Sequence, residues 1–432
     1  MRSIGLLGAI SIGIGGMVGG GIFAVLGEAV SLAHGATAVA FLIAGVVALL
    51  TAYSYVKLSV CYQSEGGTVT FIDKAFGDNI LSGSINLMLW LSYLITISLY
   101  ATAFASYGGT FFKEYTPFIK HSLITFAIIL PALINLVSAS FVGKSETVIV
   151  VIKVSLLTLV IIAGASYVEP QRLSVANWGT PLSIVTAGMI IFVAYEGFEL
   201  IANSAEDIKE PLKNLPRAFY ASVTIVIILY LLISIITVGN VPEDALMKAK
   251  DYALALAAKP SLGETGFVIV ASAALLSTLS AINATIYGNA RLGYIIAKDG
   301  KLPKQLMQQK SDVPFMGVVY TVVFSLILAN TINLDEIAII GSAGFLLIFL
   351  VVNISAYRLK EEIGAQGIIV ATSSLFTLLA LLTLMFHTYS SNPRAVVIFM
   401  GFVIFSLLFE LIYGRYIRGH MFRRTYNIKD EK

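Results

Sequence analysis

The sequence contains few charged residues and a single cysteine. Charged side chains make up 12% of the 432 residues, about half the share found in soluble globular chains. The lone Cys61 excludes a disulfide within the chain. The formal net charge of +3 is small, so we expect no nucleic-acid partner.

Motifs for energy supply and for catalysis are also missing. The sequence has no Gly-x-x-x-x-Gly-Lys-Ser/Thr loop, so we do not expect ATP to drive the protein. No nucleophile–base set stands out, and the histidines lack metal-ligand spacing; they are His34, His121, His387 and His420. We therefore expect neither an enzyme nor a metal or cofactor.

Long apolar runs dominate instead. Hydrophobic residues make up 57% of the chain, and the mean hydropathy is +0.88. Because a membrane-spanning helix needs about 20 mainly apolar residues, the runs predict an all-α integral membrane protein with twelve transmembrane helices. The expected spans are 3–33, 36–62, 81–110, 121–140, 144–166, 181–205, 216–239, 264–297, 314–331, 334–357, 365–387 and 394–416.

The distribution of basic residues predicts the orientation of these spans. With the N-terminus in the cytoplasm, twenty Lys and Arg residues fall on the cytoplasmic side and seven outside, with Lys153 alone inside the membrane. Such a bias favours a multi-pass protein of the cell membrane with both termini cytoplasmic. Residues 242–260 are too charged to span, and we expect them to form an amphipathic surface helix.

Glycine is concentrated in the first span, in the stretch SIGIGGMVGGGIF. Glycine costs about 1 kcal/mol per residue in a helix interior relative to alanine, so this stretch predicts an interrupted helix. The alternative is a packing face, since Gly15/Gly19 and Gly16/Gly20 have Gly-xxx-Gly spacing. The triple glycine at 19–21 exceeds what such a face needs, which favours the interruption.

A second interruption is predicted in the sixth span, in FVAYEGFELIANSAEDIKEP. Glu196 and Glu199 flank Gly197 in the middle of this span. A charged residue there is costly unless it faces a cavity or a partner. Two interrupted helices at corresponding places in two halves indicate an inverted-repeat transporter with its ligand site at the interruptions.

An unwound segment offers both donors and acceptors to a ligand. The amide groups that begin a half-helix attract an anion, and exposed carbonyls accept from a cation. A zwitterionic amino acid carries both charges, so it is the expected ligand.

Five separated motifs resemble the amino acid–polyamine–organocation (APC) superfamily, and most closely the ApcT-type proton-coupled amino acid transporters. The motifs are GGMVGGGIF, FVAYEGFE, AEDIKEPLKNLPRA, SAINATIYGNARLGYIIAKDGKLP and a lysine in the fifth span. The resemblance implies a LeuT-like 5+5 inverted repeat. The first repeat would be 1–166, the inverted second repeat 181–358, the last two helices 363–416 and a cytoplasmic tail 417–432.

The resemblance also implies roles for individual residues. It places the substrate carboxylate on the amides of Gly19, Gly20 and Gly21, and the substrate amine on the carbonyls of Gly16, Met17, Val193 and Glu196. Many relatives have an aromatic gate where this chain has Val193, so Phe192 or Tyr195 would take that role. Glu199 matches a glutamate of arginine- and polyamine-handling relatives, and we expect either a selectivity role or a structural cap.

Lys153 is the candidate for proton coupling. It lies about 15 Å into its span at 1.5 Å per residue, near the middle of the membrane, where ionisable groups are functional by default. The alternative is a purely structural lysine. In sodium-coupled relatives a metal bridges helices one and eight at this place, so the resemblance implies that the ammonium acts as a built-in cation. Its implied partners are the carbonyl of Gly15 or Gly16 and the hydroxyls of Ser277 or Ser280.

Two function hypotheses within one fold remain. The first is secondary active transport of neutral amino acids with broad specificity, by proton symport and without sodium. The second is a sodium-independent exchanger or uniporter of cationic amino acids or amines. A sensor would need an output domain and a channel would need a continuous polar pore, and neither is evident in the sequence, nor is an obligate protein partner.

Overall fold

The computed structural model describes residues 2–137, 139–310 and 313–416, and helices form nearly all of this part of the chain. The predicted tail, 417–432, lies outside the described residues. The α-helices are α1 (Leu6–Met17), α2 (Gly21–Ala33), α3 (Thr37–Cys61), α4 (Thr68–Phe76), α5 (Ile80–Gly109), α6 (Pro117–Val137), α7 (Ala139–Gly164), α8 (Pro181–Ile190), α9 (Leu200–Asn203), α10 (Pro211–Asn240), α11 (Glu243–Lys248), α12 (Ala253–Ala257), α13 (Lys259–Lys298), α14 (Phe315–Thr331), α15 (Leu334–Arg358), α16 (Gly367–Ser391) and α17 (Pro393–Tyr416). The 3₁₀ helices are η1 (Ala165–Tyr167), η2 (Pro170–Leu173), η3 (Val175–Asn177), η4 (Ile191–Tyr195), η5 (Ala205–Asp207), η6 (Lys250–Tyr252) and η7 (Lys304–Met307).

Ten helical segments in the described part of the chain are long and apolar enough to cross a membrane. An eleventh span consists of α1 and α2, which are bent by 47° at the break between them. The apolar helix α14 is shorter, with 17 residues. The predicted all-α membrane protein is thus confirmed, while the exact number of twelve spans stays a prediction.

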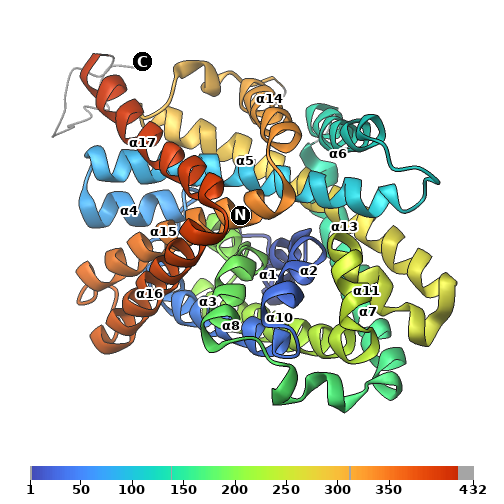
Figure 1. Cartoon of the computed structure of the whole chain (residues 1–432). Coiled ribbons are helices and arrows are strands. Elements are labelled where there is room, and N and C mark those ends of the chain that lie inside the picture. Colours follow the sequence, from blue (N-terminus) through green and yellow to red (C-terminus); the bar gives the residue numbers. More distant parts are fainter. Residues whose placement is uncertain (1, 138, 311–312, 417–432) are drawn as a thin grey trace.

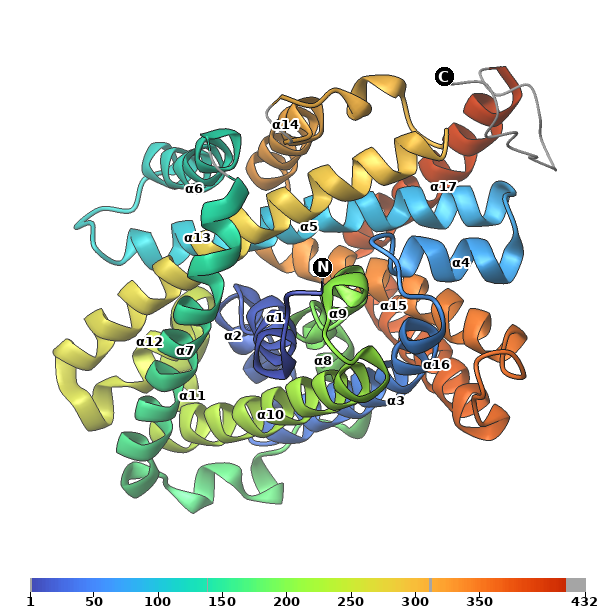
Figure 2. The same ribbon diagram turned by 180° about the vertical axis from the view of Figure 1, so that it is seen from behind.

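The interrupted span lies in the middle of the molecule. Helices α3, α8, α10 and α13 surround α1 and α2, whereas α6, α16 and α17 lie at the periphery (Figures 1 and 2). The peripheral helices expose large apolar side chains such as Ile368, Phe386 and Val397. Lipid tails are the natural partners of such surfaces in a membrane protein.

Polar side chains join neighbouring helices inside this apolar protein. The Asn353 amide on α15 donates to the Thr51 hydroxyl on α3 at 3.2 Å and to the Thr377 hydroxyl on α16 at 3.0 Å. Lipid tails are as apolar as the side chains, so the hydrophobic effect does not hold helices together in a membrane. Hydrogen bonds of this kind contribute to their association instead. They attach α16 to the bundle that contains the breaks.

The connector between α10 and α13 differs from its prediction. Instead of one amphipathic helix over 242–260, it forms α11, η6 and α12. It also packs more deeply into the protein than a surface helix would, since Leu246 and Leu254 are buried. The reason is tertiary: η6 packs onto α2, where the Lys250 backbone lies against Gly27.

Candidate functional site

The first break comprises Val18, Gly19 and Gly20, between α1 and α2. The amides that begin α2 have no acceptor within the helix, and the binding of an anion by Gly19–Gly21 stays a prediction. Gly20 is also tightly packed, because a Cβ at this position would overlap the ring of Tyr100 on α5. Both roles foreseen for these glycines, an interrupted helix and close packing, therefore meet at Gly20.

The second break runs from Glu196 to Glu199, between η4 and α9. Gly197 has a φ of +116°, a conformation that side chains with a Cβ rarely adopt. The Glu199 carboxylate caps this turn: it accepts the Gly197 amide at 2.7 Å and the Tyr93 hydroxyl at 3.0 Å. Glu199 is fully buried, and these contacts are those of the predicted structural cap.

The last turn of α1, directly before the first break, touches the second break. A Cβ on Gly16 would lie 2.6 Å from the carbonyl oxygen of Gly197, so only glycine fits at this crossing. The hydroxyl of Tyr230 on α10 lies between the two chain segments, 2.7 Å from the Met17 carbonyl and 3.1 Å from the Ala194 carbonyl. The arrangement brings together backbone segments about 180 residues apart.

Serine hydroxyls attach the breaks to the second half of the chain. Ser277 on α13 donates to the Gly19 carbonyl at 2.6 Å and lies 3.3 Å from that of Val18. Ser342 on α15 accepts the Val193 amide at 3.0 Å. Ser277 thus joins the first break to α13 directly, while the predicted bridge through the Lys153 ammonium stays a prediction.

A cavity of about 560 Å³ reaches the meeting point of the breaks from one side of the protein. Its inner wall includes Gly15, Gly16, Glu196 and Gly197. Its outer part is formed by residues before α1, after α3, after α9 and near the end of α13, so it opens on the face where the described chain begins. Figure 2 shows that α1 and α9 lie beside the N-terminus on this face.

An ion pair stands at the mouth of this cavity. Arg291 on α13 and Glu65, which follows α3, are 3.0 Å apart and both line the cavity. The guanidinium also lies over the ring of Tyr287, 5.7 Å from its centroid. This side of the cavity can therefore narrow or widen with the distance between α13 and the segment after α3.

Aromatic side chains of α5 form part of the inner wall. Tyr93 and Tyr100 both line the cavity together with Glu196. From the sequence, Glu196 was expected to act through its backbone carbonyl, and Tyr100 was not singled out. The position of these side chains follows from the path of α5 beside both breaks, which no local pattern encodes.

Several predicted site residues lie near the cavity but not in its wall. Gly19–Gly21 do not line it; the Tyr100 ring lies against Gly20, and Ala194 lies against Gly21. Phe192, Val193 and Tyr195 are fully buried in the core. Phe192 packs on the Phe349 ring, and Tyr195 donates to the Phe41 carbonyl at 2.9 Å.

Lys153 lies on α7, a helix that packs against α1, α10 and α13. It is only 4% exposed, although many of its neighbours on α7 face outward. Ser280, one of its predicted partners, is also buried on α13. The helices that carry the predicted coupling groups are thus in contact.

Salt bridges close the opposite side of the breaks. Lys250 in η6 pairs with Glu28 on α2 and with Asp335 at the start of α15, 2.9 Å away. Burial lowers the pKa of Lys250, but the two carboxylates outweigh it and raise that pKa above its usual value. This cluster joins α2, the α10–α13 connector and α15 on the face away from the cavity mouth.

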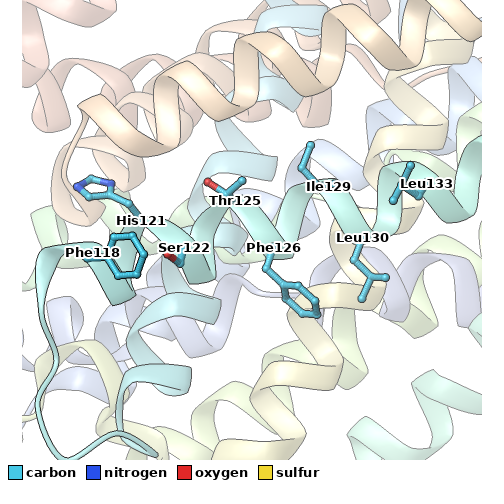
Figure 3. A pocket seen from close by; sticks show the side chains of 8 residues that line it. All are labelled: Phe118, His121, Ser122, Thr125, Phe126, Ile129, Leu130 and Leu133. Carbon is cyan, nitrogen blue, oxygen red and sulfur yellow. The ribbon is translucent and has the colours of Figure 1, made fainter.

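A further groove, on the outer surface, differs in kind from the cavity. All the side chains that line it come from α6 and are mostly apolar (Figure 3). A groove on one peripheral helix brings no convergent polar groups together, unlike a typical ligand site. The cavity at the breaks is therefore the candidate site.

Comparison with known proteins establishes the family. A family model described as amino acid permease matches residues 8–414. The chain belongs to the amino acid permease family, within the APC superfamily. This permease is 35% identical over 441 residues to an uncharacterised protein of Methanocaldococcus jannaschii, covering 98% of this chain and 99% of the relative.

Two further relatives have transport names. The inner membrane transport protein YbaT of Escherichia coli is 33% identical over 417 residues, covering 96% of this permease and 97% of the relative. The branched-chain amino acid permease BcaP of Bacillus subtilis is 24% identical over 386 residues, covering 84% and 81%. The permease is therefore a multi-pass membrane transporter of the amino acid type rather than an enzyme, which confirms the predicted superfamily.

Proposed function

We propose that this permease is a proton-coupled symporter of neutral amino acids that works by alternating access. The observation that carries the proposal is the meeting of two helix breaks at the inner end of a cavity that opens on one face. Backbone groups in a membrane protein stay unwound only where they are buried or line a cavity. Breaks of this kind bind ligands in transporters built from repeats.

The zwitterionic part of the substrate binds where the breaks meet. The amides of Gly19, Gly20 and Gly21 receive the carboxylate, because the N-terminus of α2 favours negative charge. The amine lies toward Gly16, Met17, Val193 and Glu196. The Tyr100 ring lies against Gly20 in this conformation, so we expect the ring to shift when the carboxylate binds.

The two faces of the protein alternate in access. The cavity mouth at Glu65 and Arg291 is the cytoplasmic entrance, in keeping with the distribution of basic residues. The cluster of Lys250, Glu28 and Asp335 is the outer closure. Outward opening would separate these charges and bring the groups around the cytoplasmic mouth together.

Lys153 carries the coupling proton in this scheme. When protonated, its ammonium ties α1 to α13 through the Gly15 carbonyl and the Ser280 hydroxyl, beside the bond that Ser277 already makes with Gly19. When deprotonated, it loses the charge-assisted bond, and α1 is freer to move. Phe192 and Tyr195 support the second break from the core side, and Glu199 holds its turn.

The test is uptake of labelled amino acids into proteoliposomes, with and without an imposed pH gradient. We expect accumulation of alanine or leucine that rises as the external pH falls and does not need sodium. N-acetyl and methyl-ester derivatives should compete poorly, because each leaves buried polar groups unpaired at a cost of about 1–3 kcal/mol. Accumulation that follows a sodium gradient instead would overturn the proton coupling.

The second candidate, an exchanger or uniporter of cationic amino acids or amines, is favoured by one observation. Glu196 lines the cavity, and no ion pair to its carboxylate occurs in the described part of the chain. Equal competition by putrescine and by the best amino acid would support this candidate over the symporter.

A further inference from the structure

The acidic group of Glu196 has no role in the symport scheme above, although it lies in the cavity wall. Three side chains with a formal charge line the cavity: Glu65, Arg291 and Glu196. Glu65 and Arg291 pair with each other at 3.0 Å. Within the described residues, Glu196 is therefore the one carboxylate of the wall without a basic partner.

The surroundings of this carboxylate are poor in donors. Glu196 is only 3% exposed, and the Thr96 hydroxyl donates to it from 3.4 Å. The Tyr100 hydroxyl is its other polar neighbour. A buried carboxylate is costly unless it is neutralised and hydrogen-bonded. A cationic ligand in the cavity would supply both the positive charge and the hydrogen-bond donors.

The position of Glu196 fits the amine of the expected zwitterion. Gly197 crosses directly over Gly16, which places the residue before it beside the first break. The Tyr100 ring lies against Gly20 while its hydroxyl neighbours Glu196, so the carboxylate is one side-chain length from the amides that begin α2. The α-carboxylate and α-ammonium of an amino acid, with a hydrogen bond at the outer end of each, span a comparable distance.

Of the backbone carbonyls expected to hold the amine, that of Met17 already has a donor, and so do the nearby carbonyls of Ala194 and Gly19. The Met17 and Ala194 carbonyls face the Tyr230 hydroxyl, and Ser277 occupies the Gly19 carbonyl. A carbonyl has two lone pairs, but these three already have a donor at close range. The Glu196 carboxylate is the stronger acceptor that remains on the cavity side.

We propose that the Glu196 side chain is the receptor for the α-ammonium group of the substrate. This inference rests on the proposed amino acid transport. A charge-assisted hydrogen bond connects the ammonium to the Glu196 carboxylate, and the Thr96 hydroxyl supports the second oxygen. Ammonium and proton then compete for one carboxylate, so substrate affinity falls as the pH on the open side falls.

Other titratable groups face Glu196 and bear on its response to pH. They are Glu199 of the same break, Tyr93 and Tyr100 of α5, and Tyr230 of α10. Arg291 and Glu65 stand farther out at the mouth, and Lys153 lies on α7 behind α1. Glu199 accepts from the Gly197 amide and the Tyr93 hydroxyl, which leaves Glu196 to respond to the cavity.

The experiment measures binding of labelled L-leucine, L-lysine and putrescine to the full-length permease in nanodiscs. It compares the native protein with Glu196→Gln and with Glu206→Gln, a control that removes an exposed carboxylate ten residues away. Thermal stability is recorded for each protein. Glutamine keeps the shape of the side chain and one acceptor but loses the charge, so the Glu196→Gln variant should fold.

The expected result is a loss of about 10- to 100-fold in affinity for both L-leucine and L-lysine in Glu196→Gln, the range of one charge-assisted hydrogen bond. Glu206→Gln should bind as the native protein does. Native affinity should fall as the pH is lowered, because protons compete with the ammonium for the carboxylate. This measurement tests the inference without any variant.

Other results separate the inference from the proposed function. If native protein binds L-leucine, and Glu196→Gln binds it equally well, the inference is overturned while amino acid transport stands. A loss confined to L-lysine also overturns it, because Glu196 would then contact the substrate side chain. Glu196-dependent binding of putrescine alone supports an amine receptor and refutes amino acid transport. No binding of any probe refutes both.

Discussion

Tyr230 offers a sharp test of whether contact between the two breaks matters for transport. Its hydroxyl lies 2.7 Å from the Met17 carbonyl and 3.1 Å from the Ala194 carbonyl, and the side chain is fully buried. Tyr230→Phe removes this hydroxyl and leaves the ring. Two buried carbonyls then lose a donor, at a cost of about 1–3 kcal/mol in the free energy of unfolding.

Tyr195 supplies a matched control for this change. It is equally buried, its ring packs against that of Tyr230 at 5.2 Å, and its hydroxyl donates to the Phe41 carbonyl at 2.9 Å. Tyr195→Phe therefore removes a similar hydrogen bond that does not join the breaks. Both variants should lose a few degrees of thermal stability in detergent.

Uptake into proteoliposomes distinguishes the two variants. We expect Tyr230→Phe to lower the initial rate of uptake of the best amino acid about 5- to 100-fold, the factor that corresponds to about 1–3 kcal/mol. Tyr195→Phe should keep most of that rate. Equal rates in the two variants would refute the idea that transport depends on the contact between the breaks.

Three further changes test separate features of the protein. Gly20→Ala should lower the free energy of unfolding by about 1–3 kcal/mol, because the new methyl group would overlap the Tyr100 ring. Gly401→Ala is the control, since Gly401 has open space around it. Equal melting temperatures for the two variants would contradict this prediction. Lys153→Ala should abolish accumulation driven by a pH gradient while equilibrium binding persists, and unchanged pH-driven accumulation would make the lysine purely structural. Lys250→Met should destabilise the protein by about 2 kcal/mol, because two carboxylates lose their cation; the loss of a fully buried pair would cost about 3–5 kcal/mol. Lys248→Met, at an exposed lysine, is the control. If calorimetry in detergent shows no difference between the two variants, the result would argue against an outer closure.

The interruptions could be predicted from the sequence because their causes are local. Clustered glycines weaken a helix wherever they occur. Gly197 lies between two glutamates in an apolar span, and this combination favours an interrupted helix. The structure has both interruptions, with a 47° bend at the first and a φ of +116° at the second.

The composition of the cavity wall could not be predicted in the same way. Tyr100 and Tyr93 are aromatic residues in an apolar helix, and only the packing of α5 beside the breaks gives them a place in the wall. The direction of each glutamate depends on the 3₁₀ turn of η4, which leaves Glu196 toward the cavity and Glu199 toward Gly197. A small difference in register would change which carboxylate faces the cavity.

The ion pairs between elements far apart in the chain could not be predicted from the sequence either. Lys250 lies in a stretch whose charges predicted an exposed helix, yet it pairs with carboxylates from α2 and α15. Charge pairs between elements far apart in the chain depend on the assembled fold, not on periodicity. The connector consequently folds as three short helices around that lysine.

Thiol labelling tests most directly whether substrate binds where the breaks meet and reaches that place through the cavity. Ala281 lines the cavity and lies against Gly19 at the first break. The measurement is labelling of Ala281→Cys by a membrane-impermeant thiol reagent, in a Cys61→Ser background and in vesicles of both orientations. We expect labelling from the cytoplasmic face and protection by the transported amino acid. Labelling that the amino acid leaves unchanged, although the same protein transports it, would contradict this central claim.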